Sequence, residues 1–353
     1  MTIHNIINVL VPNMCGAEKI VCQLHSGLLA KGMDSRLIAL VGDPSKCLHN
    51  FESLGLNKDY GIKAFAKVYN YIKHNCAEGD LIHAHLFPTM LYVSLAVRIL
   101  RWKGVAVCTE HSTSNRRRGT LLGRLIDWQV YAGYRKIYCI SNGVAGALAK
   151  WMPRLSEKLT IVENGADLAF DGFEPRENHK KIIIASVGRL HKLKNYEMAL
   201  KAMSLLLDVD FEYRIAGAGD DEARLKELCE ELHLGDKVKF IGYVQDVPSF
   251  LKQADIFLIT SLWEGFGLAA VEAMNAGLPV IASDVPGLKE IVSSVDPCGV
   301  LVSPKEPDEI AAAIMELTDW DKRMRFGQNA FERSLGFSTE RMVDGYVGEY
   351  ERL

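Results

Sequence analysis

The chain has 353 residues, of which 48% are hydrophobic and 24% are charged, and its formal net charge is −3. This length and apolar content suit two α/β domains, each with its own core. Eight cysteines without CxxC pairs exclude a zinc ribbon and, with no signal peptide, predict a protein of the reducing cytoplasm. The longest N-terminal run without Lys, Arg, Asp or Glu, 81–97, contains two histidines and a proline, so it predicts a strand, a loop and a helix instead of a membrane span.

Charge is divided unequally along the chain. Residues 1–168 hold 20 Lys and Arg against 12 Asp and Glu, a net charge of +8, and residues 169–353 hold 21 against 32, a net charge of −11. A basic half suits an anionic partner such as a phosphate-bearing lipid, a membrane surface or a nucleic acid. Because no zinc-finger, RNP or helix-turn-helix pattern occurs, nucleic acid is not an expected partner.

Apolar strands alternate with periodic helices from the first residues onward. A strand over 3–11 precedes a helix over 17–31, and the later strands of the first half are predicted at 35–41, 81–84, 105–109, 136–140 and 159–162. The composition turns polar between 167 and 181, after which strands are predicted at 182–187, 212–216, 238–241, 255–259, 280–282 and 299–302. This alternation predicts two α/β domains, 1–168 and 181–337, each with a parallel, doubly wound sheet, joined by a linker over 169–180.

Three histidines stand at the ends of predicted strands in the first half. His83 and His85 end one short apolar strand, and His111 follows the next strand. Such a group could suggest a metal site, but no carboxylate or cysteine joins it at ligand spacing, so no metal is predicted. His83 could equally have a purely structural role.

A cluster of cations follows the first strand of the second half, where 188–195 reads Gly-Arg-Leu-His-Lys-Leu-Lys-Asn. Cations in the first turn of a helix oppose its dipole, so they need a local reason. A diphosphate supplies one, because Arg189 can bind it bidentately and Lys194 can act as a point charge. The alternative is a solvated basic loop.

Residues 264–272 place two carboxylates eight positions apart around a glycine-rich turn. The turn follows a predicted strand and begins an apolar helix that ends before Gly277, and loops at the carboxyl ends of strands bind ligands in open α/β sheets. Glu272 is the only charge on that helix and needs a partner, which is either the hydroxyl groups of a ligand or a structural Arg or Lys.

The spacing of Glu264 and Glu272, with Gly265, Gly267 and the Gly-Leu-Pro-Val-Ile-Ala stretch after them, resembles the Glu-x7-Glu motif of family 4 glycosyltransferases of the bacterial surface-polysaccharide type. The resemblance implies the GT-B fold, in which two Rossmann-like domains face each other across a cleft. It also implies a retaining, metal-independent transferase without a cofactor, because the nucleotide-sugar is a co-substrate. The tail 338–353 would cross back onto the first domain.

The same resemblance assigns roles around this motif. Glu272 would hold the ribose hydroxyls of the donor, and Glu264 would face the donor sugar. Backbone N–H groups of Phe266, Gly267 and Leu268 would meet the sugar and the diphosphate, since glycine admits a close approach and a helix N-terminus favours phosphate.

Weaker family motifs occur in the expected order along most of the chain. Residues 15–19 resemble the Gly-Gly-Ala-Glu-Arg loop with Cys15 in place of the first glycine, so Gly16 is the donor-binding candidate unless the loop is a plain helix-starting turn. His111 matches the histidine beside the reacting face of the donor sugar, and His85 would line the acceptor side of the cleft.

In the second half, Arg189 and Lys194 match the Gly-Arg-x4-Lys element that neutralises the leaving diphosphate. The resemblance therefore gives catalytic roles to these two cations, to Glu264 and to His111. Gly217 and Tyr243 lie in loops that resemble the nucleotide-side loops of the family.

Residues 115–128 join arginines to the leucine-rich start of a helix. In one reading, Arg116, Arg117 and Arg118 bind anionic lipid beside an interfacial helix. In the other, Leu121, Leu122, Leu125 and Ile126 pack into the core and the arginines are solvated. The net charge of this half favours the first reading, a peripheral enzyme on the inner face of the cytoplasmic membrane.

We therefore expect a glycosyltransferase of the hexosyltransferase type that uses a nucleotide diphosphate donor, with a UDP-sugar favoured. Its acceptor would be a glycan hydroxyl, on a lipid-linked oligosaccharide of cell-surface polysaccharide synthesis such as lipopolysaccharide. The alternatives are a nucleotide-sugar epimerase of the same two-domain fold and a transferase with a small soluble acceptor. A dehydrogenase is less favoured because no G-x-G-x-x-G follows the first strand.

Overall fold

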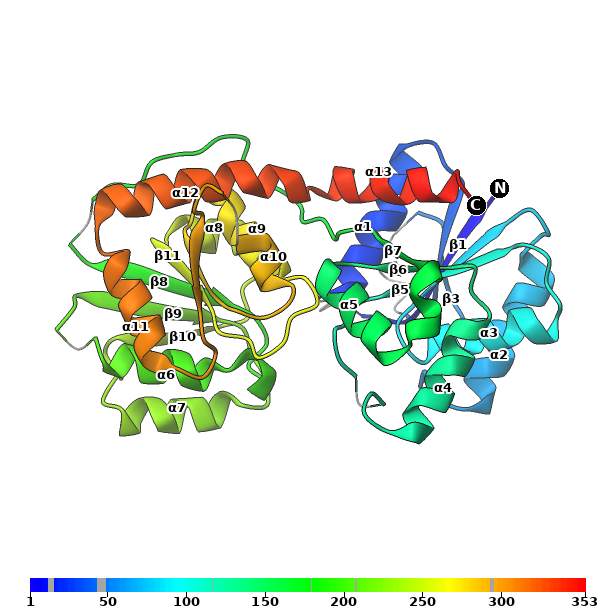
Figure 1. Ribbon diagram of the computed structural model, residues 1–353, viewed down its shortest axis with the longest axis horizontal. Helices are drawn as coiled ribbons and strands as arrows, with labels where there is room; N and C mark the ends of the chain where they lie inside the picture. Colours follow the sequence, from blue (N-terminus) through cyan, green and yellow to red (C-terminus); the bar gives the residue numbers. More distant parts are fainter. Residues whose placement is uncertain (12–15, 43–48, 116, 179, 207, 293–294) are drawn as a thin grey trace. The chain divides into compact units, whose positions relative to one another are not determined.

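The computed structural model describes residues 1–353 except 12–15, 43–48, 116, 179, 207 and 293–294. It divides into two compact units. Unit 1 comprises Met1–Gly165 together with Thr339–Leu353, and unit 2 comprises Ala166–Ser338. The tail helix α13 (Thr339–Tyr350) therefore belongs to the unit that contains the N-terminus (Figure 1).

The described part of unit 1 is built on a seven-stranded parallel sheet in the order β3-β2-β1-β4-β5-β6-β7. Its strands are β1 (Ile3–Leu10), β2 (Ser35–Gly42), β3 (Phe51–Ser53), β4 (Leu81–His85), β5 (Val105–Glu110), β6 (Lys136–Cys139) and β7 (Leu159–Ile161). The order reverses between β1 and β4, and open α/β sheets bind ligands at the carboxyl ends of strands beside such a switch point.

Helices cover both faces of this sheet. They are α1 (Ala17–Ala30), α2 (Ile62–Asn75), α3 (Thr89–Ile99), α4 (Leu121–Ala132), α5 (Asn142–Trp151) and α13, with a 3-10 helix at Pro153–Lys158. In Figure 1, α2, α3 and α4 lie together on one side of the sheet, whereas α1 packs against α13 on the other. Gly27 of α1 leaves no room for a Cβ beside Val343 of α13, so these two helices approach closely.

The described part of unit 2 is built on a six-stranded parallel sheet in the order β10-β9-β8-β11-β12-β13. Its strands are β8 (Ile182–Val187), β9 (Phe211–Ala216), β10 (Val238–Gly242), β11 (Ile256–Ile259), β12 (Val280–Ser283) and β13 (Gly299–Val302). Here the switch point lies between β8 and β11. The buried strands are almost entirely apolar, which is typical of parallel sheets covered on both faces.

The helices of unit 2 are α6 (Tyr196–Ser204), α7 (Glu222–Glu231), α8 (Val247–Lys252), α9 (Leu268–Asn275), α10 (Leu288–Val292), α11 (Pro307–Glu316) and α12 (Trp320–Ser334), with 3-10 turns at Lys192–Lys194 and Leu335–Phe337. Helix α6 contacts α7 and α11, and α9 contacts α8, α10 and α12. The prediction of two doubly wound α/β domains is confirmed. Among the described residues, no helix is both long and apolar enough to cross a membrane.

Candidate functional site

The topological switch point of unit 2 brings together two residues that are far apart in the sequence. Lys194 follows β8 and Glu264 follows β11, and Lys194 Nζ lies 2.5 Å from Glu264 Oε1. The hydroxyl of Ser261 donates a hydrogen bond of 2.8 Å to the same carboxylate oxygen. The side chains of Lys194 and Glu264 are 30% and 14% exposed, so the ion pair is partly shielded from water but remains at the surface.

Backbone and hydroxyl contacts fix the two loops against each other. Leu262 N donates to Leu193 O at 2.9 Å, and the Thr260 hydroxyl lies 3.1 Å from the carbonyl oxygens of Lys194 and Asn195. The ammonium of Lys194 therefore projects from a backbone that the β11 loop holds in place. Such support for a charged side chain is what a preorganised binding site requires.

The cations do not occupy the first turn of a helix, contrary to the sequence-based argument. Lys192–Lys194 form a 3-10 turn, and Asn195 follows it in the left-handed conformation with φ of 56° before α6 begins at Tyr196. The first turn of α6 instead carries an acidic residue, Glu197, which suits the helix dipole. Lys194 therefore does not oppose a helix dipole, and its positive charge is neutralised by the carboxylate of Glu264.

Arg189, the other predicted diphosphate ligand, is a solvated side chain. It is 63% exposed, and its Nη2 lies 3.5 Å from the carboxylate of Asp220, which is 83% exposed. An exposed pair of this kind contributes little to stability. The guanidinium is therefore able to change partner at little cost when an anion binds.

Gly217 allows the β8 and β9 loops to touch. A Cβ at this position would overlap the carbonyl oxygen of Gly188, so only glycine fits without movement of the backbone. The N–H of Gly217 donates to Gly242 O at 2.7 Å and is occupied within the protein. Tyr243, directly after β10, is 68% exposed. The proposed donor-binding roles of Gly217 and Tyr243 stay predictions.

The glycine-rich turn of the Glu-x7-Glu segment starts α9 as predicted. Gly267 caps the helix with φ of 101°, and its Cα packs so closely on Leu288 that a Cβ would lie 2.6 Å from that side chain. Phe266 is buried edge-to-face against Phe337, with ring centroids 5.7 Å apart. Leu268 and Glu272 are half-buried on α9. Donor binding by these residues, by backbone or by carboxylate, stays a prediction.

The predicted histidines of unit 1 form hydrogen-bonded groups at the ends of β4 and β5. His83 is fully buried, with Nδ1 2.7 Å from Tyr350 Oη and Nε2 2.7 Å from Thr109 Oγ1, which supports its structural reading. His85 is 1% exposed, and its Nδ1 lies 3.4 Å from Nε2 of His111. Burial lowers the pKa of His111 to about 4, so the ring is neutral at pH 7. No three His, Cys, Asp or Glu side chains of the described residues group as metal ligands would.

Gly16 stands at the start of α1, after the first strand of the sheet. It caps the helix with φ of 57°, a conformation that favours glycine, and a Cβ there would meet open space. Its predicted contact with the donor stays a prediction. Cys15 lies outside the described residues.

Arg117 and Arg118 of the basic segment point into unit 1, contrary to both readings of that segment, whereas Arg124 is exposed. Arg117 Nε donates to Asp127 Oδ1 at 2.7 Å, and the guanidinium stacks on Phe87 at 4.0 Å from the ring centre. Arg118 is 10% exposed and donates to the carbonyl oxygen of Thr113 at 2.5 Å. Arg116 lies outside the described residues.

The leucines of this segment point outward, where one reading placed them in the core. Leu121, Leu122 and Leu125 of α4 are 83%, 68% and 66% exposed, and Ile126 is half-buried. The buried residues of α4 are Gly123, Asp127, Val130 and Tyr131, and the backbone of Arg117 leaves no room for a Cβ at Gly123. The buried face therefore combines the carboxylate of Asp127, paired with Arg117, with two apolar side chains, Val130 and Tyr131.

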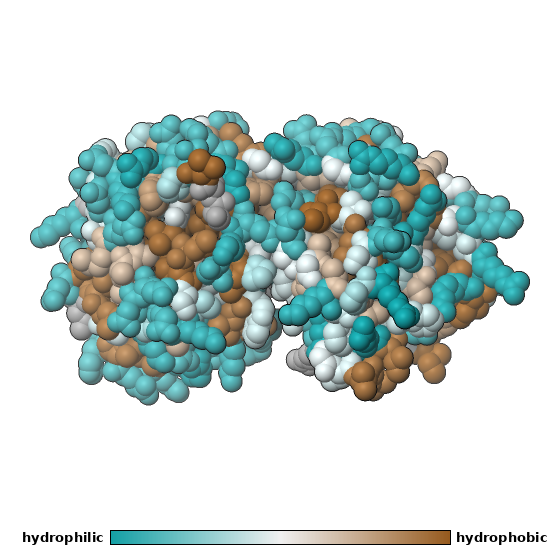
Figure 2. All heavy atoms as spheres, viewed as in Figure 1, coloured by the Kyte–Doolittle hydropathy of each residue, from teal (hydrophilic) through white to brown (hydrophobic). Residues whose placement is uncertain are grey.

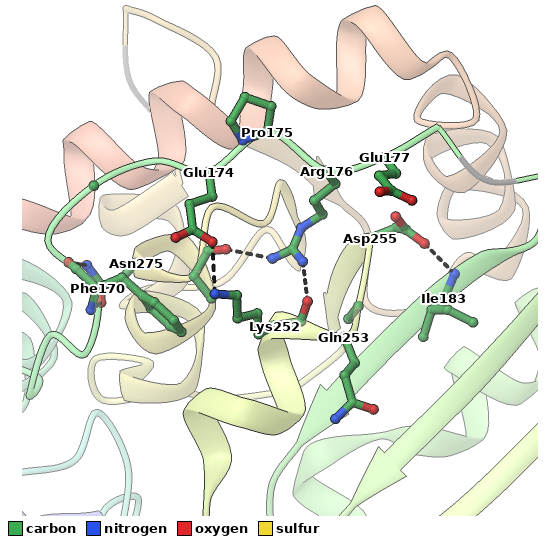
Figure 3. Close-up of a pocket in the computed structure, with 13 residues that line it drawn as sticks. Phe170, Glu174, Pro175, Arg176, Glu177, Ile183, Lys252, Gln253, Asp255 and Asn275 are labelled. Carbon is green, nitrogen blue, oxygen red and sulfur yellow. Dashed lines mark hydrogen bonds and ion pairs between the residues drawn. The ribbon is translucent and has the colours of Figure 1, made fainter.

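A hollow of about 260 Å³ lies at the opposite end of the unit 2 sheet, at the amino ends of β8 and β11 (Figure 3). Arg176 extends across it and donates to the carbonyl oxygens of Lys252 and Ala276. Asp255 accepts a hydrogen bond of 2.8 Å from Ile183 N. These contacts attach the predicted linker to unit 2, and the hollow is separate from the loops that carry Lys194 and Glu264.

Sequence reasoning found Lys194 and Glu264 but not the residues that position them. Ser261 and Thr260 belong to no sequence motif. Their contacts with Glu264 and with the backbone of Lys194 form because β8 and β11 are neighbours in the sheet. The buried polar residues Asn5, Ser35 and His25 of unit 1 were likewise missed. A polar residue within an apolar strand was the available signal, as at Asn5 in β1.

Comparisons with known proteins bear on the family and the fold of this chain. Residues 14–170 match the family model described as Glycosyltransferase Family 4, and residues 169–333 match that described as Glycosyl transferases group 1. An uncharacterized glycosyltransferase of Methanocaldococcus jannaschii is 36% identical over 273 residues, which cover 71% of this chain and 69% of the relative. The Escherichia coli UDP-Gal:alpha-D-GlcNAc-diphosphoundecaprenol alpha-1,3-galactosyltransferase is 25% identical over 363 residues, which cover 95% and 89%.

Among solved structures, Anabaena HepE in complex with UDP superposes with a TM-score of 0.84 at 19% identity, with 100% of both chains covered. At this identity the likeness concerns the fold.

Proposed function

The chain belongs to glycosyltransferase family 4 and has the GT-B type of fold, and on that premise we propose that it transfers a sugar from a UDP-sugar to a glycan hydroxyl with retention at the anomeric carbon. The nucleotide is supported by HepE, solved with UDP and with UDP-glucose. The acceptor class is supported by the E. coli galactosyltransferase, whose name gives a diphosphoundecaprenol-linked acceptor, and by a putative colanic acid biosynthesis glycosyltransferase, 33% identical over 196 residues.

The observation that carries the proposal is the Lys194–Glu264 pair at the switch point of unit 2. In the proposed donor complex, Lys194 and the exposed guanidinium of Arg189 face the diphosphate, and the N-terminus of α9 adds its dipole. Glu264, held by Ser261, faces the sugar, and Glu272 binds the ribose hydroxyls. Each group lies on a loop after a strand or on the helix that follows it.

The proposed reaction breaks the bond between the anomeric carbon and the diphosphate oxygen while the acceptor oxygen attacks from the same face. The departing phosphate oxygen takes the proton of the acceptor hydroxyl, so atoms and charge balance without another reactant. Negative charge grows on the diphosphate as the bond breaks. Positive charges stabilise the leaving diphosphate, so Lys194, which the β11 loop holds in place, and Arg189, which would turn toward the diphosphate, would replace a metal ion in this reaction.

Kinetics with UDP-sugars test this assignment. Lys194→Met and Arg189→Met should each lower kcat for sugar transfer or donor hydrolysis by about 100-fold. Lys192→Met is the matched control, because Lys192 lies in the same 3-10 turn and is exposed. Equal effects of all three changes, or normal turnover of the Lys194 variant, would refute the assignment, and conversion of the UDP-sugar to its epimer would identify an epimerase instead.

A second part of the proposal concerns membrane binding, and it rests on the outward face of α4. Leu121, Leu122, Leu125 and Trp128 are 83%, 68%, 66% and 52% exposed, and Figure 2 shows hydrophobic residues gathered over this helix at the lower edge of the view. Exposed cations adjoin this face. They are Arg98, which lies over Trp128, and Arg124 of α4.

Exposed apolar side chains with arginines beside them fit the boundary between headgroups and acyl chains of an anionic bilayer. Each cation near such a surface contributes about 1 kcal/mol, and each leucine adds the gain from leaving water. We therefore propose that α4 docks unit 1 on an anionic membrane, where a lipid-linked acceptor is found. The surface differs from the one expected from the sequence, since Arg117 and Arg118 are internal.

Co-sedimentation with vesicles containing an anionic phospholipid tests the docking. Leu122→Ser with Leu125→Ser should abolish binding at low salt, and Arg98→Ser with Arg124→Ser should weaken it. Leu205→Ser is the control, because Leu205 is 53% exposed in unit 2. Binding that survives the leucine changes would show that α4 is not the docking surface. A wild-type protein that does not bind the vesicles would point to a soluble acceptor.

A further inference from the structure

A chain of buried polar groups runs through unit 1 to His111. His25 of α1, Ser35 of β2, Asn5 of β1 and His85 of β4 are between 0% and 1% exposed. Neighbouring members are joined by hydrogen bonds of 2.8, 3.1 and 3.4 Å, and His85 continues to His111 at 3.4 Å. Burial of polar side chains is costly unless each finds a partner, so the direction of every bond in this chain matters.

The backbone carbonyl of His49 determines which nitrogen of His25 carries the proton, at the first end of this chain of hydrogen bonds. Nε2 of His25 lies 2.7 Å from the carbonyl oxygen of His49, which can only accept, so Nε2 carries the proton. Burial lowers the pKa of His25, and its ring is neutral, so Nδ1 is an acceptor. The single hydroxyl hydrogen of Ser35 must then be donated to Nδ1 of His25.

The same reasoning fixes the donor and the acceptor of each following hydrogen bond, from Ser35 to His111. Because the hydrogen of Ser35 is already used, its oxygen can only accept from Asn5, and this places the Nδ2 amide group of Asn5 toward Ser35. The carbonyl oxygen of Asn5 therefore faces His85 and accepts from its Nε2. Nδ1 of His85 is left as an acceptor, and Nε2 of His111 donates to it.

We infer that His25, Ser35, Asn5 and His85 form a hydrogen-bond relay that fixes His111 in the Nε2–H tautomer and leaves its Nδ1 as an acceptor for a hydroxyl group of a sugar substrate. Nδ1 of His111 is shielded from bulk water and has no hydrogen-bond partner among the residues that the structure describes. The ring as a whole is half-buried, so it is not sealed in the core.

The relay restricts what His111 can bind. With its one proton committed to His85, the ring cannot donate a hydrogen bond to a phosphate oxygen or act as a general acid. An acceptor nitrogen requires a donor, and hydroxyl groups are the donors that sugars carry. His25, Ser35, Asn5 and His85 are positioning residues in this account, which rests on the proposed function for the identity of the ligand.

Nitrogen-15 NMR of the histidine side chains in the full-length, ligand-free protein tests the relay itself. His111, assigned by comparison with His111→Gln, should show an unprotonated Nδ1 and a protonated Nε2. The variant Ser35→Ala should move these signals toward a mixture of tautomers, and Ser35→Thr, which keeps the hydroxyl, should restore them. A protonated Nδ1 in the wild type overturns the relay whatever the enzyme catalyses, even if the Ser35 variants fail to fold.

Kinetics identify the hydroxyl that Nδ1 accepts from. Ser35→Ala should lower kcat/KM about tenfold, the loss of one oriented hydrogen bond, whereas Ser94→Ala should not, although Ser94 is also buried in unit 1. The penalty should vanish with a deoxy substrate that lacks the bound hydroxyl, and deoxy donors and deoxy acceptors distinguish the two sources. A penalty that persists with every deoxy analogue contradicts the inference. A wild type that does not turn over any UDP-sugar overturns the proposed function and leaves the NMR result standing.

Discussion

Replacing Lys194 should destabilise the ligand-free protein, although the sequence alone suggests the opposite. If Lys194 opposed a helix dipole, its removal would relieve repulsion. In the structure, however, its ammonium bonds the Glu264 carboxylate, which is only 14% exposed. Lys194→Met keeps much of the side-chain stem and removes the charge, so it isolates the ion pair.

The size of the effect follows from the partial burial of the pair. Fully exposed pairs contribute roughly 0–1 kcal/mol, whereas breaking a buried pair costs roughly 3–5 kcal/mol. Glu264 keeps the hydrogen bond from Ser261, and the 30% exposure of Lys194 admits screening. We therefore expect a loss of about 2 kcal/mol, which corresponds to a fall in Tm of about 4–8 °C for a unit of this size.

Urea and thermal unfolding of Lys194→Met, Glu264→Gln, the double variant that combines them, and Arg189→Met measure this effect. Arg189→Met is the control, because Arg189 is 63% exposed and should change stability by less than about 0.5 kcal/mol. The double variant with Glu264→Gln should show a coupling energy of about 1–2 kcal/mol between the two sites. Coupling near zero, or equal stabilities of the Lys194 and Arg189 variants, would refute the ion pair as a structural element of the site.

Three further predictions concern the rest of the site and unit 1. Glu272→Gln should weaken UDP binding by about 1.5–3 kcal/mol in calorimetry while leaving the fold intact, and unchanged affinity would remove Glu272 from the ribose site. Tyr350→Phe should cost about 1–2 kcal/mol of unfolding free energy, because it deprives the fully buried His83 of a partner, and deletion of 339–353 should cost far more. Burial holds the pKa of His83 and His85 well below 6.5, so below pH 6.5 the unfolded chain binds protons that the folded protein does not. The free energy of unfolding should therefore be unaffected by these two histidines above about pH 6.5. It should fall as the pH is lowered, by up to about 1.4 kcal/mol per pH unit and per histidine. A Tm that does not change from pH 7 to pH 5 would contradict this.

The sequence by itself determined the two doubly wound sheets. Buried parallel strands are continuous apolar runs and their crossover helices are periodic, and both signals are local, so β8 and β11 were placed to within a residue. The turn that begins α9 could also be predicted from the sequence, because Gly267 marks a backbone conformation that other residues rarely adopt. The three-residue strand β3 was missed, since it is too short to show a period.

Only the tertiary structure decided which side chains meet and which way they face. Lys194 and Glu264 are 70 residues apart, and they pair because the sheet reverses its order between the strands that precede them. Arg117 turns inward and pairs with the buried carboxylate of Asp127. Leu125 lies outside, because α4 buries Val130 and Tyr131 instead. Composition ranks arginine as exposed and leucine as buried, but a buried carboxylate needs a partner, and the residue that supplies it is fixed by the packing of the whole unit.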